Sequence, residues 1–115
     1  MKKIPIIVIA FFGVGLFQYC SSSKKAAKAP APLSYTKDIS PILQTSCTPC
    51  HFPPDGKKEP LNSYDAVVNH LDEMIARVKL PTSDIKFMPF KLKKPALSDT
   101  AINALLLWKS QGMGK

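Results

Sequence analysis

The stretch Cys47-Thr48-Pro49-Cys50-His51 places two thiols three positions apart, with an imidazole directly after the second thiol. The chain has 115 residues and only one other cysteine, Cys20, so it lacks the cysteine density of a disulfide scaffold. Its length allows one small domain and excludes a multidomain enzyme, a solenoid and a polytopic membrane protein. These five residues therefore carry the most specific chemistry in the sequence.

Two cysteines at this spacing, followed at once by a histidine, are typical of covalent c-type haem attachment. The two sulfurs would bond the vinyl groups on one edge of the porphyrin, and the His51 imidazole would coordinate the iron. Three other uses of the motif stay open. The first is a thioredoxin-type dithiol, which would need a βαβ setting. The second is a zinc site, for which His70 is the only other histidine. The third is a plain Cys47–Cys50 disulfide. A disulfide would leave His51 without a role.

Three helices are predicted, and no strand alternation persists beyond a few residues, so the expected fold class is all-α. The expected helices span residues 38–47, 63–80 and 98–112. Ser40, Ser63 and Ser98 are their expected N-caps. The third helix is expected to bury a face centred on Ala101, Leu105 and Trp108.

A domain of this size with three short helices has a thin apolar core, because ordering the chain costs nearly as much free energy as apolar burial returns. A covalently attached haem would supply a large apolar disc for the helices to pack around. We therefore expect a small bundle of about three helices around a haem, spanning residues 33–115.

The loop between the second and third expected helices carries Met88, the candidate second axial ligand, within Phe87-Met88-Pro89-Phe90. Pro89 restricts Met88 to an extended conformation, which suits a ligand presented from a loop. A thioether paired with a histidine raises the reduction potential relative to two imidazoles. The alternative is that Met88 is a core residue of an apolar loop. Two weaker candidates lie on the second helix. Met74, within its apolar stripe, is expected to pack in the core, and His70, off the centre of that stripe, is expected to be solvated.

The N-terminus has the composition of an export signal. A positive start precedes an apolar run of 14 residues, 4–17, which is shorter than the roughly 20 that a membrane-spanning helix needs. Cys20 then resembles the acylated cysteine of bacterial lipoproteins, so residues 1–20 are expected to be a signal peptide that ends at a lipid-bearing Cys20. The alternatives are that Cys20 is trimmed off with the signal, or that the segment stays as an uncleaved anchor. Residues 21–32 contain only Ser, Lys, Ala and Pro and are expected to be a flexible linker.

Several segments together resemble small single-haem cytochromes c, and especially the exported or lipoprotein cytochrome c-like domains of environmental bacteria. The segments are residues 35–43, 47–51, 88–89 and 97–108. The resemblance covers residues 33–112 and implies one haem c, with thioethers at Cys47 and Cys50 and with His51 and Met88 as axial ligands. It also implies that the first and last helices cross beside the haem. The export signal predicts that the protein is exported and lies in the periplasm, or is anchored to a membrane and faces the periplasm or the cell exterior.

An iron with both axial positions filled has no open site for oxygen or peroxide, so the expected function is one-electron transfer and not enzymatic catalysis. Two alternatives remain open. One is a haem-based enzyme or ligand sensor, peroxidase-like, in which Met88 is displaced. The other is an accessory haem module of a larger redox complex.

The charge of the chain bears on its partners. The formal net charge is +8, and loss of the two lysines of the leader leaves +6. Lys86, Lys91, Lys93 and Lys94 flank Met88, which predicts docking onto an acidic surface of redox partner proteins. The alternative is that these lysines only keep the loop soluble. Nucleic-acid binding is not expected, because the lysines are not interleaved with stacking aromatics.

Overall fold

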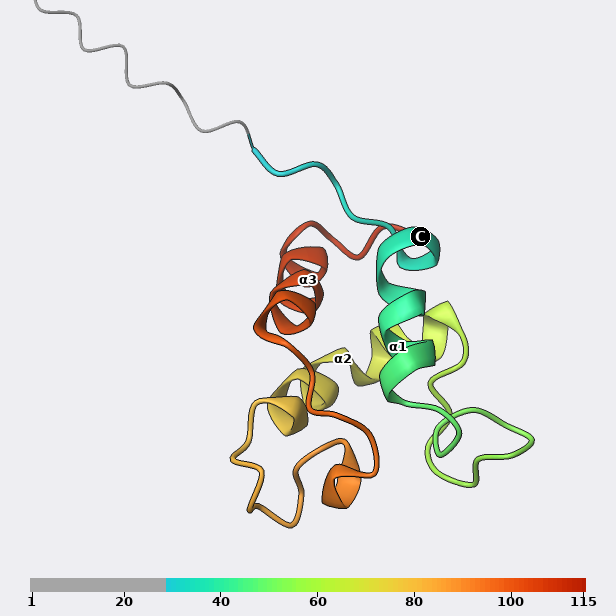
Figure 1. Cartoon of the computed structure of the whole chain (residues 1–115). Helices are drawn as coiled ribbons and strands as arrows, with labels where there is room; N and C mark the ends of the chain where they lie inside the picture. Colours follow the sequence, from blue (N-terminus) through green and yellow to red (C-terminus); the bar gives the residue numbers. More distant parts are fainter. Residues whose placement is uncertain (1–28) are drawn as a thin grey trace, which may run out of the picture.

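The computed structural model describes residues 29–115, and all the regular elements in that range are helical. The elements are a π-helical turn η1 (Tyr35–Ile39), α1 (Ser40–Ser46), α2 (Tyr64–Val78), a 3-10 turn η2 (Phe90–Leu92) and α3 (Asp99–Ser110) (Figure 1). The predicted all-α class and its three helices are confirmed. The expected signal peptide, Cys20 and most of the expected linker lie outside the described residues.

Two of the predicted N-caps are confirmed. The hydroxyl of Ser63 accepts a hydrogen bond from the amide of Ala66 over 3.3 Å, and that of Ser98 accepts one from the amide of Ala101 over 3.2 Å. Each bond satisfies an amide that has no partner within the first turn of its helix. Gly112 follows the end of α3 with φ +86°, a left-handed conformation that costs glycine little, as expected of a helix C-terminus.

The prediction that Ser40 caps the first helix is wrong. Ser34 is the cap: its hydroxyl accepts a hydrogen bond from the amide of Lys37 over 3.2 Å, while its own amide donates to the Asp38 carboxylate over 2.8 Å. This reciprocal pair of hydrogen bonds starts the helical backbone ahead of η1. Ser40 therefore lies inside a continuous helical segment, where its hydroxyl accepts from the amide side chain of Gln44.

The helices enclose a small apolar core. It contains Ile39, Leu43, Leu61, Val67, Leu71, Ile75, Leu105 and Trp108. The buried positions of α2 recur at the predicted helical spacing. Leu105 and Trp108 are fully buried on α3, so the predicted orientation of that helix is confirmed.

The first and last segments of the described chain are joined at one end of the domain. The amide side chain of Gln111 accepts a hydrogen bond from the Leu33 amide over 2.8 Å and donates one to the Ala31 carbonyl over 3.2 Å. The indole of Trp108 donates to the Gly114 carbonyl over 2.8 Å. Figure 1 shows both segments meeting at the top of the domain, far from the long loops at the bottom. The chain that follows the expected linker is thus fixed to this end.

Candidate functional site

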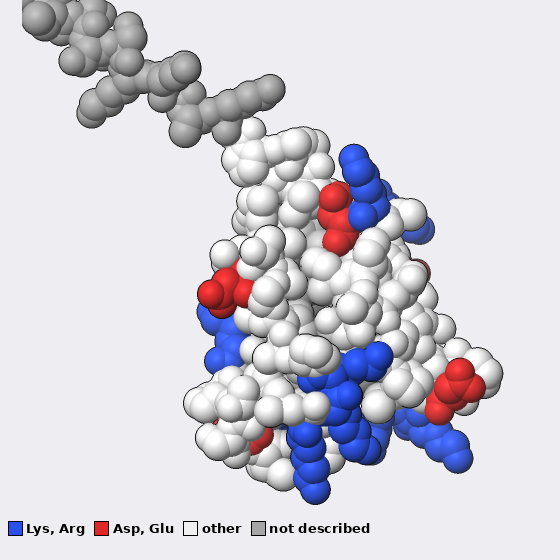
Figure 2. Space-filling view, viewed as in Figure 1, with Lys and Arg blue, Asp and Glu red and all other residues white. Residues whose placement is uncertain are grey.

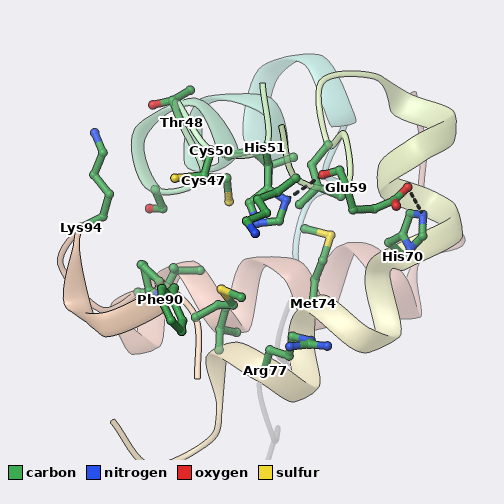
Figure 3. Close-up of a pocket in the computed structure, with 18 of the residues that line it drawn as sticks. Cys47, Thr48, Cys50, His51, Glu59, His70, Met74, Arg77, Phe90 and Lys94 are labelled. Atoms are coloured by element: carbon green, nitrogen blue, oxygen red, sulfur yellow. Dashed lines mark hydrogen bonds and ion pairs between the residues drawn. The ribbon is translucent and has the colours of Figure 1, made fainter. Parts of the chain in front are cut away.

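A cavity of about 970 Å³ lies between the C-terminal end of α1, one side of α2 and the α2–α3 connection. That volume is within the range of small-molecule and cofactor sites, roughly 300–1,000 Å³. The cavity is lined by all four of the site residues predicted within the domain, Cys47, Cys50, His51 and Met88. Figure 3 shows the first three of them. Cys20, the predicted lipidation site, lies outside the described residues.

The two cysteines and His51 occupy a tight turn at the end of α1. The amide of Cys47 donates to the Leu43 carbonyl over 2.7 Å, and the amide of His51 donates to the Cys47 carbonyl over 3.0 Å. These bonds continue the helical path beyond Ser46, so that closely spaced residues line one cavity. Both thiols are free. Burial raises the pKa of the Cys47 thiol to about 11, which keeps that thiol protonated at neutral pH.

The imidazole of His51 is oriented by a main-chain group. Its Nδ1 lies 2.7 Å from the carbonyl oxygen of Glu59 (Figure 3). Because a carbonyl oxygen only accepts, Nδ1 carries the proton and Nε2 presents a lone pair. Histidines that bind metals are typically fixed in this way through the second ring nitrogen. His51 is therefore suited to coordinate a metal through Nε2.

The loop between the motif and α2 packs against the backbone of the motif. The amide of Lys58 donates to the Cys50 carbonyl over 3.1 Å, and the amide of Leu61 donates to the His51 carbonyl over 2.9 Å. At Gly56, an added Cβ would lie 2.1 Å from the Pro49 carbonyl oxygen, so only glycine fits there. Neither this contact nor the role of the Glu59 carbonyl could be predicted from the sequence. A lone glycine in a loop is a weak signal, and a carbonyl leaves none.

Met88 reaches the cavity from the opposite segment of the chain. Its amide donates to the carbonyl of Arg77, in the last turn of α2, over 3.3 Å. The preceding Phe87 is buried, with an exposed fraction of 3%. These two attachments hold the half-buried Met88 at the cavity wall, and the structure brings its side chain into the same cavity as His51.

Two weaker candidates from the sequence also line the cavity. Met74 projects from α2 into the region below His51 in Figure 3 and also packs against the core, the role that was predicted for it. His70 was expected to be solvated, and its side chain is 35% exposed. Its Nε2 lies 3.1 Å from a carboxylate oxygen of Glu59, so this nitrogen is already engaged.

Lysines surround the opening of the cavity. Those that line it are Lys58, Lys86, Lys93 and Lys94. Lys91 lies beside them, with its Nζ 5.3 Å from the centre of the Phe90 ring. Figure 2, in which Lys and Arg are both blue, shows many of these basic side chains at the lower end of the molecule, away from the point where the described chain begins. Ile85 and Phe90, two exposed apolar side chains, share this rim.

The acidic side chains of the cavity lining, Glu59 and Glu73, are both paired. Arg77 donates two hydrogen bonds to one carboxylate oxygen of Glu73, over 2.9 Å and 2.6 Å, and thereby holds the pKa of that carboxyl below its usual value. Glu59 contacts His70. The lysines of the rim therefore have no acidic partner within the cavity lining.

Among residues 29–115, no three His, Cys, Asp or Glu side chains lie close enough together to hold a metal ion. Within the same range, no helix has the length and apolar character needed to cross a bilayer.

Comparison of the chain with protein-family models, with curated proteins and with solved structures found no match. A proposal for the function of this chain therefore rests on the residues that line the cavity.

Proposed function

We propose that this chain is a small c-type cytochrome that carries single electrons between redox partner proteins. One haem c would be attached through Cys47 and Cys50, with His51 and Met88 as axial ligands. The observation that carries the proposal is that these four side chains line one cavity of about 970 Å³, although 37 positions separate the motif from Met88.

The side chains that line the cavity have the chemical groups that a covalently attached haem needs. The two thiols are free, and the one that is more buried is protonated at neutral pH. The Nδ1 of His51 is occupied by the Glu59 carbonyl, so Nε2 is the nitrogen available to iron. Leucine side chains line the cavity, among them Leu43, Leu61 and Leu105. Such an apolar wall excludes water from a macrocycle.

Electron transfer fits these residues better than catalysis does. A bound haem would supply a one-electron redox couple. Enzymatic use of peroxide or oxygen needs an open iron position and acid–base groups beside it. The two carboxylates that line the cavity are paired with His70 and Arg77, and a thioether from Met88 would occupy the far face of the iron.

The rim of the cavity suits an acidic partner. Its lysines surround two exposed apolar side chains, Ile85 and Phe90, a combination that favours docking and steered association. Gln111 holds residues 31–33 at the end of the domain opposite η2, which carries Phe90 of this rim (Figure 1). If export leaves a lipid on Cys20, the rim would remain free for partners while the protein is held at a membrane.

The test is mass spectrometry of the full chain made with a haem-attachment system, combined with an absorption spectrum. We expect one covalently bound haem, which acidified organic solvent does not remove, and a lipid on Cys20. The ferric form should show a sulfur-to-iron charge-transfer band and bind cyanide only slowly. The double variant C47A/C50A, made in the same way, should retain no covalent pigment.

A colourless wild-type protein, or one that loses its pigment to acidified solvent, would overturn the proposal. Covalent haem with a high-spin ferric spectrum and rapid cyanide binding would instead favour the enzyme or sensor alternative. Haem without a lipid would leave the electron-transfer proposal in place and overturn the anchoring at Cys20.

A further inference from the structure

Glu59 connects the two histidines that line the cavity. Its carbonyl oxygen lies 2.7 Å from the Nδ1 of His51, and its carboxylate lies 3.1 Å from the Nε2 of His70 (Figure 3). One residue thus contacts one imidazole through its main chain and the other through its side chain.

His70 and Glu59 differ in how firmly their backbones are held. His70 lies in the middle of the 15-residue helix α2, next to the buried Leu71. Glu59 lies in an exposed loop, whose main-chain hydrogen bonds at Lys58 and Leu61 lead back to the motif itself. Such bonds would move together with the motif. The contact with His70, together with the burial of Leu61, fixes the loop to a separate and rigid element.

We propose that His70 is a positioning residue for His51. By holding the Glu59 side chain against α2, it keeps the Glu59 carbonyl in place as the acceptor for the His51 Nδ1 proton. This inference rests on the proposed function, in which the Nε2 of His51 binds the haem iron.

The contact has an electronic consequence. A hydrogen bond from Nδ1 raises the basicity of Nε2, and a more basic ligand stabilises ferric over ferrous iron. A firmly held Glu59 carbonyl therefore lowers the reduction potential. A side-chain contact as exposed as that between Glu59 and His70 contributes little to global stability. Its effect should appear in the ring of His51 and not in the unfolding midpoint.

The experiment uses the haem-loaded full chain and two measurements, the midpoint potential and the exchange of the His51 Nδ1 proton with deuterated solvent by NMR. His70→Leu removes the contact, and Glu59→Ala removes the carboxylate but keeps the carbonyl. We expect both variants to exchange this proton about tenfold faster than wild type and to have a higher potential. His70→Gln retains an amide donor and should remain near wild type.

The matched control is Asp72→Asn. Asp72 also lies on α2, and the substitution removes its ion pair with Lys109 of α3, outside the cavity. It should leave both measurements unchanged. Wild-type exchange and potential in both His70→Leu and Glu59→Ala, with haem attached, would overturn the positioning role and leave the proposed function standing. A wild-type chain that takes up no haem would instead overturn both.

Discussion

The amide of Met88 donates a hydrogen bond to the carbonyl oxygen of Arg77 over 3.3 Å, which ties the α2–α3 connection to the last turn of α2. Carbonyl groups in the last turn of a helix need hydrogen-bond donors from outside the regular helical ladder. Arg77 is itself held by an ion pair with Glu73 one turn earlier. The position of Met88 is thus set by a helix that also lines the cavity, and not by its own loop alone.

We predict that Met88→Ala abolishes the sulfur-to-iron charge-transfer band of the ferric protein while haem remains attached. The variant should bind cyanide and carbon monoxide rapidly and have a lower midpoint potential, because iron then loses its thioether ligand. Absorption spectroscopy and redox titration measure these changes.

Met74→Ala is the control for that variant, because Met74 is the other methionine that lines the cavity. It should keep the band and lose about 2 kcal/mol of stability, since Met74 packs against the core. A band lost in Met74→Ala but kept in Met88→Ala would show that the ligand was assigned to the wrong methionine.

Helix positions could be predicted because their signals are local. Ser63 and Ser98 precede apolar residues at helical spacing, and both act as caps. Ser40 failed as a cap because Ser34 and Asp38, four positions apart, form a competing pair that starts the helix earlier. The sequence contains that pair, but two serines ahead of one apolar run do not indicate which of them caps.

We predict that Gly56→Ala destabilises the domain by at least about 2 kcal/mol and lowers the yield of attached haem. The new Cβ would lie 2.1 Å from the Pro49 carbonyl oxygen, and a main-chain atom cannot move away as a flexible side chain can. Denaturant unfolding and the ratio of haem absorbance to protein would measure the two effects.

Gly114→Ala is the matched substitution for Gly56→Ala. Its added Cβ would lie 3.3 Å from the Leu33 carbonyl oxygen, so a small adjustment is enough and stability should change by about 0.5 kcal/mol or less. Equal effects of the two alanines would mean that the close approach at Gly56 does not constrain the motif.

We predict that, in haem-free protein, the Cys47 thiol reacts with iodoacetamide much more slowly than Cys50 at pH 8.5. The thiolate is the reactive form, and burial raises the pKa of Cys47 from 9.0 to about 11. The rate at Cys47 should therefore still rise between pH 9 and pH 11. For the same reason, the folded state should lose stability over that range, because the unfolded chain releases the thiol proton first.

Peptide mapping of the alkylated cysteines separates the two rates. The variant Cys47→Ala should lack the part of the stability loss that comes from this thiol, and protein with haem attached should lack it as well, because a thioether does not titrate. A Cys47 rate that levels off near pH 9 would contradict the effect of burial.

Some contacts of the site could not be predicted from the sequence. They are made by main-chain atoms, or they join distant positions. The acceptor for His51 is the carbonyl of Glu59, and every residue has a carbonyl. The approach of Gly56 to Pro49 depends on how the loop folds back on the motif. By contrast, Cys47, Cys50 and His51 could be singled out because their side chains carry the chemistry and their spacing is local.

The lysines that surround the cavity opening should steer the encounter with an acidic partner. We expect the triple variant Lys91→Gln, Lys93→Gln and Lys94→Gln to slow electron delivery to an acidic redox partner at low ionic strength, with a smaller difference at high salt, because screening weakens long-range attraction. Stopped-flow kinetics over a salt series measures this. The control removes the same charge at Lys37, Lys109 and Lys115, none of which lines the cavity. Equal slowing by both variants would show that net charge, and not the position of the lysines, governs the encounter. An unchanged salt dependence in the first variant would leave those lysines only the role of keeping the loop soluble.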